Sequence, residues 1–295
     1  MPHDHAHHHS HSAAAGAFRW SVLLNALLTG AQLAIGFGFG SLALIGDAIH
    51  NLGDVVGLLL GWGADHLSRR PARGRFTYGF GRSTHMAALI NGLLVFAAGA
   101  VVVVEAIQRL RDPHPVAAGP VAWAALAGIV INLASARLFG HGHQHDLNRR
   151  AAVLHLLTDA AVSAAVLLTA LLVWCTGWMV LDAITALLVG AVVMLSAFGL
   201  LREALAASLD AAPADLDLAA VEAALRELPG VEAVAELHVW AVSTATLALT
   251  AHLRCDPASL GQPQALLQDA EARLRAFGIA KSTLQLEGPG PLHHH

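Results

Sequence analysis

Charged residues are scarce in this chain. Only 13% of its 295 residues are Asp, Glu, Lys or Arg, whereas 56% are hydrophobic, and the mean hydropathy is +0.58. Soluble domains carry about 25% charged residues, so the composition excludes an ordinary soluble protein. We expect an integral α-helical membrane protein whose surroundings are the lipid bilayer, with no nucleic-acid partner.

Cysteine is also scarce, and the features of a signal peptide are absent. The two cysteines, Cys175 and Cys255, are expected on different sides of the membrane or at different depths, which excludes a disulfide framework. Residues 1–16 contain no Lys or Arg and no apolar core, so we do not expect a cleaved signal peptide. Six of the first eleven residues are histidine, and residues 1–16 are predicted to form a His-rich cytoplasmic tail.

Long apolar runs occupy the first two thirds of the chain. A helix that crosses about 30 Å of hydrocarbon needs about 20 mostly apolar residues. Six runs meet this requirement, near residues 17–39, 41–63, 84–108, 116–139, 151–175 and 179–201. Arginines gather after the second run and before the fifth, which predicts cytoplasmic N and C termini. We therefore expect a multi-pass membrane domain at residues 17–208, and the high alanine content and short loops favour a bacterial inner membrane.

The last third of the chain follows another pattern. Residues 215–228 place apolar side chains on one helical face, and residues 231–242 and 244–253 alternate with period two. A second helix at 258–278 and a last strand at 281–288 complete the order αββαβ. This order predicts a small ferredoxin-like α+β cytoplasmic domain at residues 209–290. The terminal residues 291–295 are native sequence or the remnant of a purification tag.

Two of the apolar runs each carry a histidine and an aspartate four residues apart, which places the pair on one helical face. The pairs are His50 with Asp54 and His155 with Asp159. Two imidazoles and two carboxylates form the ligand set of a tetrahedral divalent metal site, and nitrogen favours zinc over magnesium or calcium. An aspartate at mid-membrane costs roughly 2.5–3.5 kcal/mol even on the most permissive scale. The two pairs therefore predict an intramembrane metal site, whereas for any single residue a hydrogen bond between packed helices is the alternative.

The depths of the two pairs do not match at first sight. The second-run pair lies about 13 residues from Asp65, while the fifth-run pair lies about 7 residues from Arg150, a difference of about 9 Å. Either the fifth helix begins before its apolar run or the second helix continues beyond its own. We favour the first alternative.

Several motifs together carry a resemblance to a known family. They are GDAIHNLGDV at 46–55, RFTYGFGR at 75–82, HLLTDA at 155–160, ELHVWAV at 236–242 and LTAHL at 249–253. With these motifs the sequence resembles the cation diffusion facilitator family of divalent metal transporters. The resemblance implies a six-span homodimer with cytoplasmic termini and a ferredoxin-like cytoplasmic domain. It also implies export of zinc or a related ion in exchange for protons.

The resemblance assigns roles to particular residues. His50, Asp54, His155 and Asp159 fall on the transport site of the family. The histidine at position 50, where other members have aspartate, implies a preference for Zn²⁺, with Cd²⁺ and Co²⁺ still open. Asp47 is expected to support the ligands or to lie on the access path, or else to hydrogen-bond a neighbouring helix. Asp182 resembles an acid of the exit funnel, and an N-cap of the sixth helix is the equal alternative.

In the last third of the chain, the resemblance points to a second metal site. Family members bind regulatory zinc in the cytoplasmic domain near positions that correspond to His238, His252 and Glu287, although Gln285 stands where some members have histidine. A tight turn near 243–245 would pair His238 with residue 249 or 250, so the two histidines would meet only through a bulge or a second subunit.

Other polar residues have less specific expectations. The motif HGHQH between the fourth and fifth runs contains His141, His143 and His145, which are predicted to collect metal loosely. A set of polar residues inside the apolar runs is expected to pack between helices, with the lining of a cavity as the alternative, namely Asn25, Gln32, Asn91, Glu105 and Asn132.

The function predicted from these patterns is divalent metal export by alternating access. Metal ligation requires neutral imidazole and ionised carboxylate, so metal and protons compete for the same four side chains. No HExxH motif is present and no glutamate accompanies the ligands as a base, which argues against an enzyme. An intramembrane metalloenzyme and a metal-sensing membrane receptor are the alternatives, and only the transporter accounts for all the features together.

Overall fold

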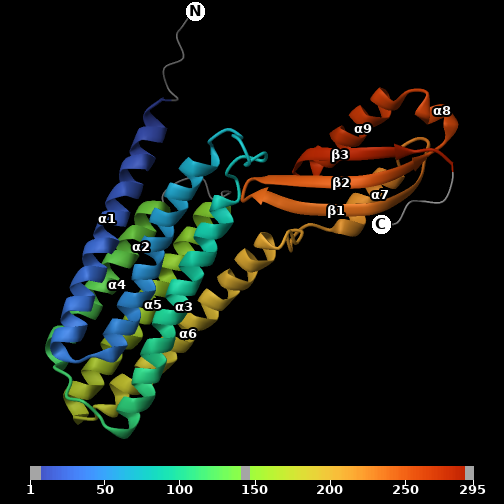
Figure 1. Ribbon diagram of the computed structural model, residues 1–295. Helices are drawn as coiled ribbons and strands as arrows, with labels where there is room; N and C mark the ends of the chain where they lie inside the picture. Colours follow the sequence, from blue (N-terminus) through green and yellow to red (C-terminus); the bar gives the residue numbers. More distant parts are fainter. Residues whose placement is uncertain (1–7, 141–146, 290–295) are drawn as a thin grey trace, which may run out of the picture. The chain divides into compact units, whose positions relative to one another are not determined.

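In the computed structural model, residues 8–140 and 147–289 are described, and the chain divides into two compact units. Of the described residues, the first unit combines 8–59 with 91–140 and 147–199, and the second combines 60–90 with 200–289. Six long helices and a small α+β domain follow one another along the chain (Figure 1). This is the predicted fold class.

The six helices are long and apolar enough to cross a membrane. Their bounds are α1 (His8–Phe39), α2 (Leu42–Ser68), α3 (Ser83–Arg111), α4 (Ala118–Gly140), α5 (Leu147–Thr176) and α6 (Val180–Ser208). The helices α1 and α2, α3 and α4, and α5 and α6 are joined at one end of the bundle by short connections. We call this the short-loop end, and we call the opposite end, where the α2–α3 connection lies, the long-loop end.

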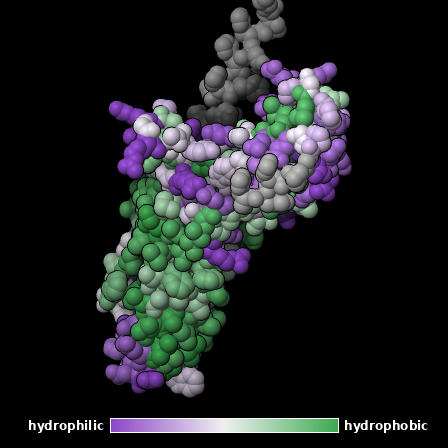
Figure 2. Space-filling model, turned by 45° about the vertical axis from the view of Figure 1, so that its right-hand side comes forward, coloured by the Kyte–Doolittle hydropathy of each residue, from purple (hydrophilic) through white to green (hydrophobic). Residues whose placement is uncertain are grey.

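The outside of the helices is apolar, as a surface that faces lipid requires. Large side chains such as Leu27, Val101, Trp123 and Leu195 are exposed, and Figure 2 shows a continuous hydrophobic surface over the helices. Between the helices, small residues allow close packing. A Cβ at Gly190 of α6, for example, would lie 2.9 Å from Val103 Cγ2 of α3.

The α1–α2 connection depends on a glycine. Gly40 has φ +79°, and a Cβ there would lie 2.6 Å from the carbonyl oxygen of Pro115. A side chain at this position would therefore be strained in the backbone and would also collide with the α3–α4 connection. The Ala117 amide donates to the Phe39 carbonyl at 3.0 Å, which holds the two connections together.

Both α2 and α5 extend beyond their apolar runs. The helix α5 begins at Leu147, before the predicted start at 151, and α2 continues to Ser68, beyond the predicted end at 63. The earlier start of α5 agrees with the alternative that the sequence favoured. The second alternative, that α2 continues beyond its apolar run, holds as well.

The α+β domain contains a three-stranded sheet with the order β1-β2-β3. The strands β1 (Val231–Ser243) and β2 (Thr246–Cys255) form an antiparallel hairpin, and β3 (Ile279–Glu287) is parallel to β2. The helix α7 (Leu218–Arg226) packs against β1, and a further helix, α9 (Pro263–Ala276), packs against β3 and contacts α7. The fully buried Leu225, Leu253 and Leu274 lie in the core between the helices and the sheet.

The prediction of a single helix at 258–278 is wrong, because the structure has two helices there. The structure has a short helix, α8 (Pro257–Leu260), and then α9 after a break at Gly261 and Gln262. Pro263 is the first residue of α9, where the missing amide hydrogen costs nothing, whereas a proline inside one continuous helix would remove an internal hydrogen bond. The proline therefore begins a new helix.

Candidate metal site

The structure brings together the four side chains that the sequence singled out on α2 and α5. His50 Nε2 lies 3.2 Å from Asp159 Oδ1, and His155 Nε2 lies 3.1 Å from Asp54 Oδ2. Each histidine thus faces the aspartate of the other helix. His155 Nε2 also lies 3.8 Å from Asp159 Oδ2, and the two imidazole rings meet edge to face with centroids 5.9 Å apart.

These distances fit the size of a tetrahedral zinc site. Zinc bonds of about 2.0–2.2 Å place the ligand atoms of a tetrahedron about 3.3–3.6 Å apart. The two reciprocal histidine–aspartate contacts are slightly shorter than this edge, and the third contact is slightly longer. His50, Asp54 and Asp159 each offer a ligand atom within 4.8 Å of the others. These three side chains form a group that can hold a small divalent cation, and His155, which lies outside that group, would have to move to become the fourth ligand.

The site is open toward the long-loop end. A pocket of about 360 Å³ contains Asp54, His155 and Asp159 in its wall. The side chain of His155 is 48% exposed, whereas that of Asp159 is 3% exposed. The pocket thus extends from these side chains in the direction of the long-loop end. The rest of the wall includes Gly57 and Leu58, which follow Asp54 along α2, and Ala152, which precedes His155 along α5, together with Val22, Asn25 and Asn91.

On the opposite side of the four ligands lies a buried polar network. Asp47 Oδ2 accepts hydrogen bonds from Gln32 Nε2 of α1 at 2.8 Å and from Ser163 Oγ of α5 at 2.9 Å. Asn51 Nδ2 donates to Gln32 Oε1 at 3.2 Å. All four side chains are buried. Gln32, which was expected to pack between helices, thus joins α1 to Asp47 of α2.

Asp182 caps a helix other than the one expected, and its part in an exit funnel stays a prediction. It lies in the first turn of α6, yet its carboxylate accepts hydrogen bonds from Ser41 Oγ at 2.6 Å and from the Leu42 and Ala43 amides at 2.7 and 3.4 Å. These amides belong to the first turn of α2, where they lack partners within the helix. The aspartate of α6 therefore caps α2.

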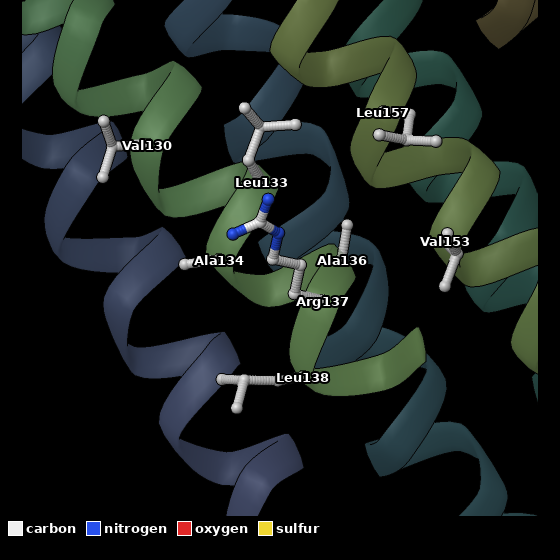
Figure 3. A pocket seen from close by; sticks show the side chains of 8 residues that line it. All are labelled: Val130, Leu133, Ala134, Ala136, Arg137, Leu138, Val153 and Leu157. Atoms are coloured by element: carbon white, nitrogen blue, oxygen red, sulfur yellow. The ribbon is translucent and has the colours of Figure 1, made fainter. Parts of the chain in front are cut away.

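A larger hollow between α4 and α5 lacks metal-binding groups. It has a volume of about 910 Å³ and is lined chiefly by aliphatic side chains, with Arg137 as the charged exception (Figure 3). None of the four metal-ligand candidates lines it. The aliphatic walls suit a hydrocarbon chain, and the guanidinium of Arg137 suits an anion. This hollow is therefore no candidate for a metal site.

The soluble domain brings together two of its three candidate residues. His252 Nδ1 of β2 lies 2.9 Å from Glu287 Oε1 of β3, and Gln285 Nε2 donates to the same oxygen at 2.9 Å. His238 pairs with Thr250 in the hairpin, as the predicted turn requires, and its Nε2 lies 3.3 Å from Glu236 Oε2. A bulge is present in β1 between 235 and 238. The contact of His238 is thus with its own strand.

Three predicted metal-collecting histidines are outside the part of the chain that the structure describes. His141, His143 and His145 all fall within residues 141–146, which lie outside the described residues. The structure therefore does not place any of the three near the four ligands, and their role stays a prediction. Residues 1–7 of the predicted His-rich tail also lie outside the described residues, and α1 begins at His8, inside the range predicted for that tail.

Two residues of the buried network escaped sequence reasoning. They are Ser163 and Asn51, which contact Asp47 and Gln32 respectively. Ser163 follows Asp159 by four residues and so shares its helical face, which is the signal that would have found it. Asn51 follows Asp47 by four residues and could have been found in the same way.

Comparison with known proteins adds to this geometry. The family described as "Cation efflux transmembrane domain" matches residues 19–207. The family described as "Cation efflux protein, cytoplasmic domain" matches residues 213–289. The chain belongs to the cation diffusion facilitator family. As a family member it is a transporter of divalent metal cations and not an enzyme, as the sequence predicted.

Relatives within the cation diffusion facilitator family cover nearly the whole chain. A protein named "Zinc transporter ZitB" from Escherichia coli is 37% identical over 281 residues, which is 88% of each chain. "Cation efflux system protein CzcD" from an Alcaligenes species is 33% identical over 97% of this chain and 89% of its own. A Bacillus velezensis protein named "Cadmium, cobalt and zinc/H(+)-K(+) antiporter" is 27% identical over 100% of this chain and 94% of its own.

Proposed function

We propose that the protein exports Zn²⁺ in exchange for protons, by alternating access around His50, Asp54, His155 and Asp159. The observation that carries this proposal is the pair of reciprocal histidine–aspartate contacts, 3.1 and 3.2 Å long, between α2 and α5. Two nitrogen and two carboxylate ligands suit zinc, and Cd²⁺ and Co²⁺ are the related substrates. The names of the relatives include zinc, cadmium and cobalt.

Proton exchange follows from the chemistry of the same four side chains. In the metal-free arrangement each imidazole nitrogen lies at hydrogen-bond distance from a carboxylate oxygen, so a proton can bridge each pair. A metal ion needs the nitrogen lone pair and the ionised carboxylate, so binding of the metal releases protons. Protons that enter from the other side release the metal in turn, and the two kinds of cation alternate at one site.

The direction of transport is inferred from the pocket and the arginines. The pocket leads from the ligands toward the long-loop end, where α2 continues into a connection that carries Arg70, Arg73 and Arg75. Arginine-rich connections remain in the cytoplasm. We infer that this end, and with it both termini, faces the cytoplasm of a bacterial inner membrane, and that the structure corresponds to the state that loads metal from the cell interior.

The soluble part of the chain is proposed to join two copies into a homodimer and to sense metal. His252 and Glu287 supply two ligands on neighbouring strands, and a zinc site there needs further ligands, from His238 after a rearrangement or from the second copy. The functional division we propose is a membrane domain at 17–208 and a cytoplasmic domain at 209–290. The motif that contains His141, His143 and His145 would gather metal near the entrance.

Flux measurements on purified protein in sealed liposomes test the transport site. We expect His50→Ala and Asp159→Ala each to reduce zinc flux at least about 100-fold, because each removes a ligand and leaves its partner side chain unpaired. A fluorescent pH indicator inside the vesicles should report proton movement that accompanies zinc in the unmodified protein. Proton-coupled flux also separates a transporter from a metal-sensing receptor, which would bind zinc without moving it.

His114→Ala is a matched control, because it removes an exposed imidazole from the α3–α4 connection. Its flux should equal that of the unmodified protein. Normal flux in either His50→Ala or Asp159→Ala would refute the four-residue site, and zinc flux without proton movement would refute the exchange.

A further inference from the structure

Two buried aspartates of the helix bundle differ in one respect. Both carboxylate oxygens of Asp182 are hydrogen-bonded, Oδ1 by Ser41 and Oδ2 by the first amides of α2. For Asp47, two donors share Oδ2, while Oδ1 is buried and has no hydrogen-bond partner among the described residues. Asp47 as a whole is 0% exposed. Asp182 is thus explained by its capping role, whereas Asp47 has a free oxygen.

The free oxygen is held in a fixed position. Gln32 and Ser163 donate to Oδ2 from two different helices, and Asn51 fixes the Gln32 amide by donating to its oxygen. Because both donors bind the same oxygen, the other carboxylate oxygen has no partner among the described residues. A buried acceptor without a partner costs about 1–3 kcal/mol, so an aspartate here calls for a ligand that the resting network does not contain.

Asp47 lies next to the four metal ligands on the side away from the pocket. It precedes His50 by three residues, an axial distance of about 4.5 Å along α2, and Ser163 follows Asp159 by four residues along α5. The pocket extends from the ligands in the other direction, toward Gly57. A cation that leaves the four ligands toward the short-loop end therefore meets the Asp47 level first.

The fourth helix packs closely against the network around Asp47. A Cβ at Gly128 of α4 would lie 2.8 Å from Ser163 Oγ and 3.1 Å from Gln32 Nε2, so only glycine fits beside the network. One helical turn further along α4, Asn132 is 0% exposed, and neither atom of its amide group has a hydrogen-bond partner among the described residues. Buried polar groups without a partner among the described residues thus occur on both α2 and α4.

We propose that Asp47 is a second cation site, which takes the divalent metal through Oδ1 after the metal leaves the four ligands and before its release. This inference rests on the proposed transport function. The polar side chains that contact Asp47 are an amide and a hydroxyl, and none of them is an imidazole. A metal site made of oxygen ligands holds zinc less strongly than a site with two histidines. Weaker binding at this station favours onward movement, because an ion must be able to leave each site that it enters.

The test compares metals and variants in sealed liposomes that contain the full-length protein. Asp47→Asn keeps the shape and the acceptor for Gln32 and Ser163 but removes the charge. We expect it to lower zinc flux at least about tenfold, while equilibrium dialysis in detergent shows the same zinc stoichiometry and a Kd within about threefold of the unmodified protein. Asp47→Cys should raise the ratio of Cd²⁺ to Co²⁺ initial rates at least about tenfold, because thiolate ligands select soft metals.

Asp182→Cys is the matched control, since Asp182 is a buried acid with both oxygens occupied by protein groups. Its ratio of Cd²⁺ to Co²⁺ rates should be unchanged whatever its overall rate. Three results would overturn the proposal: wild-type flux in Asp47→Asn, loss of zinc binding in Asp47→Asn, or an unchanged metal ratio in Asp47→Cys. Failure of the transport function itself is visible separately, because then the unmodified protein would move none of these metals.

Discussion

The histidines of this chain have different surroundings, and these decide what each imidazole can bind. His50 and His155 each face an aspartate of another helix. His85, at the start of α3, is buried, and its hydrogen-bond partner is the backbone of Ala241. His252 faces one glutamate on the neighbouring strand. Of these four histidines, only His50 and His155 lie in a cluster with two carboxylates, and the metal site is therefore proposed there.

The two free cysteines should react very differently with alkylating reagents. Burial raises the pKa of the Cys255 thiol, which is 0% exposed, and Asp256 and Glu232 act in the same direction. Because the thiolate is the reactive form, a raised pKa leaves less of it at pH 8. We expect N-ethylmaleimide to modify the exposed Cys175 at least about 100-fold faster than Cys255 in the folded protein, as measured by mass spectrometry of tryptic peptides.

Denaturation provides the control for this prediction. In guanidinium chloride both thiols should react at similar rates, since neither burial nor nearby carboxylates then act on Cys255. Rapid modification of Cys255 in the folded protein would show that β2 opens to solvent.

At the scale of the element, the beginning of α2 depends on another helix. The Leu42 and Ala43 amides donate to Asp182 of α6, so Asp182→Ala leaves buried donors without partners. At about 1–3 kcal/mol for each buried unpaired group, we expect a clear decrease in the apparent melting temperature of the detergent-solubilised protein. Intrinsic tryptophan fluorescence during heating gives the measurement.

Asp112→Ala is the comparison for the same end of the bundle. Asp112 is exposed beyond α3, and surface substitutions of this kind change stability by less than about 0.5 kcal/mol. Equal melting temperatures for Asp182→Ala and Asp112→Ala would contradict the capping role of Asp182.

The sequence predicts the helices and the meeting of the four side chains well, because both depend on local spacing, whereas the metal site itself stays a prediction. Apolar runs set the six spans, and the four-residue interval in α2 and α5 places the histidine and the aspartate of each helix on one face. The partner of Asp182 and the contact of Asp47 with Gln32 and Ser163 join residues far apart in the chain, so no periodicity indicates them. The break at Gly261 was missed because apolar periodicity continues across it, although Pro263 marks a helix start.

On the scale of the whole molecule, the second unit joins the α2–α3 connection to the soluble sheet. The Thr244 amide, at the turn between β1 and β2, donates to Thr84 Oγ1 of α3 at 3.3 Å. A Cβ at Gly81 would lie 2.6 Å from the Val242 carbonyl oxygen. Arg82 forms an ion pair with Asp210, which follows α6. Helix ends and sheet are therefore linked by backbone contact as well as by charge.

Backbone contact should matter more than charge at this junction. Gly81→Ala forces the methyl group against a carbonyl oxygen that cannot move independently of β1, and overpacking of this kind costs about 1–3 kcal/mol. The Arg82–Asp210 pair is half exposed on both sides, and such pairs contribute about 0.2–1 kcal/mol. We expect limited proteolysis to cleave the 69–82 connection several times faster in Gly81→Ala than in Arg82→Ala. Equal cleavage rates in the two variants would refute this ranking.

The capping of α2 by Asp182 of α6 also has a mechanical consequence. With its first turn tied to α6, α2 can swing relative to α6 about that end, and displacement grows with distance from the tie. Asp54 lies about 18 Å along the helix from Leu42, and Asp47 about 7.5 Å. A tilt of about 10° would therefore carry the Asp54 backbone about 3 Å but the Asp47 backbone only about 1.3 Å. A small rotation of α2 therefore suffices to move Asp54 away from His155 of α5, while Asp47 stays almost in place.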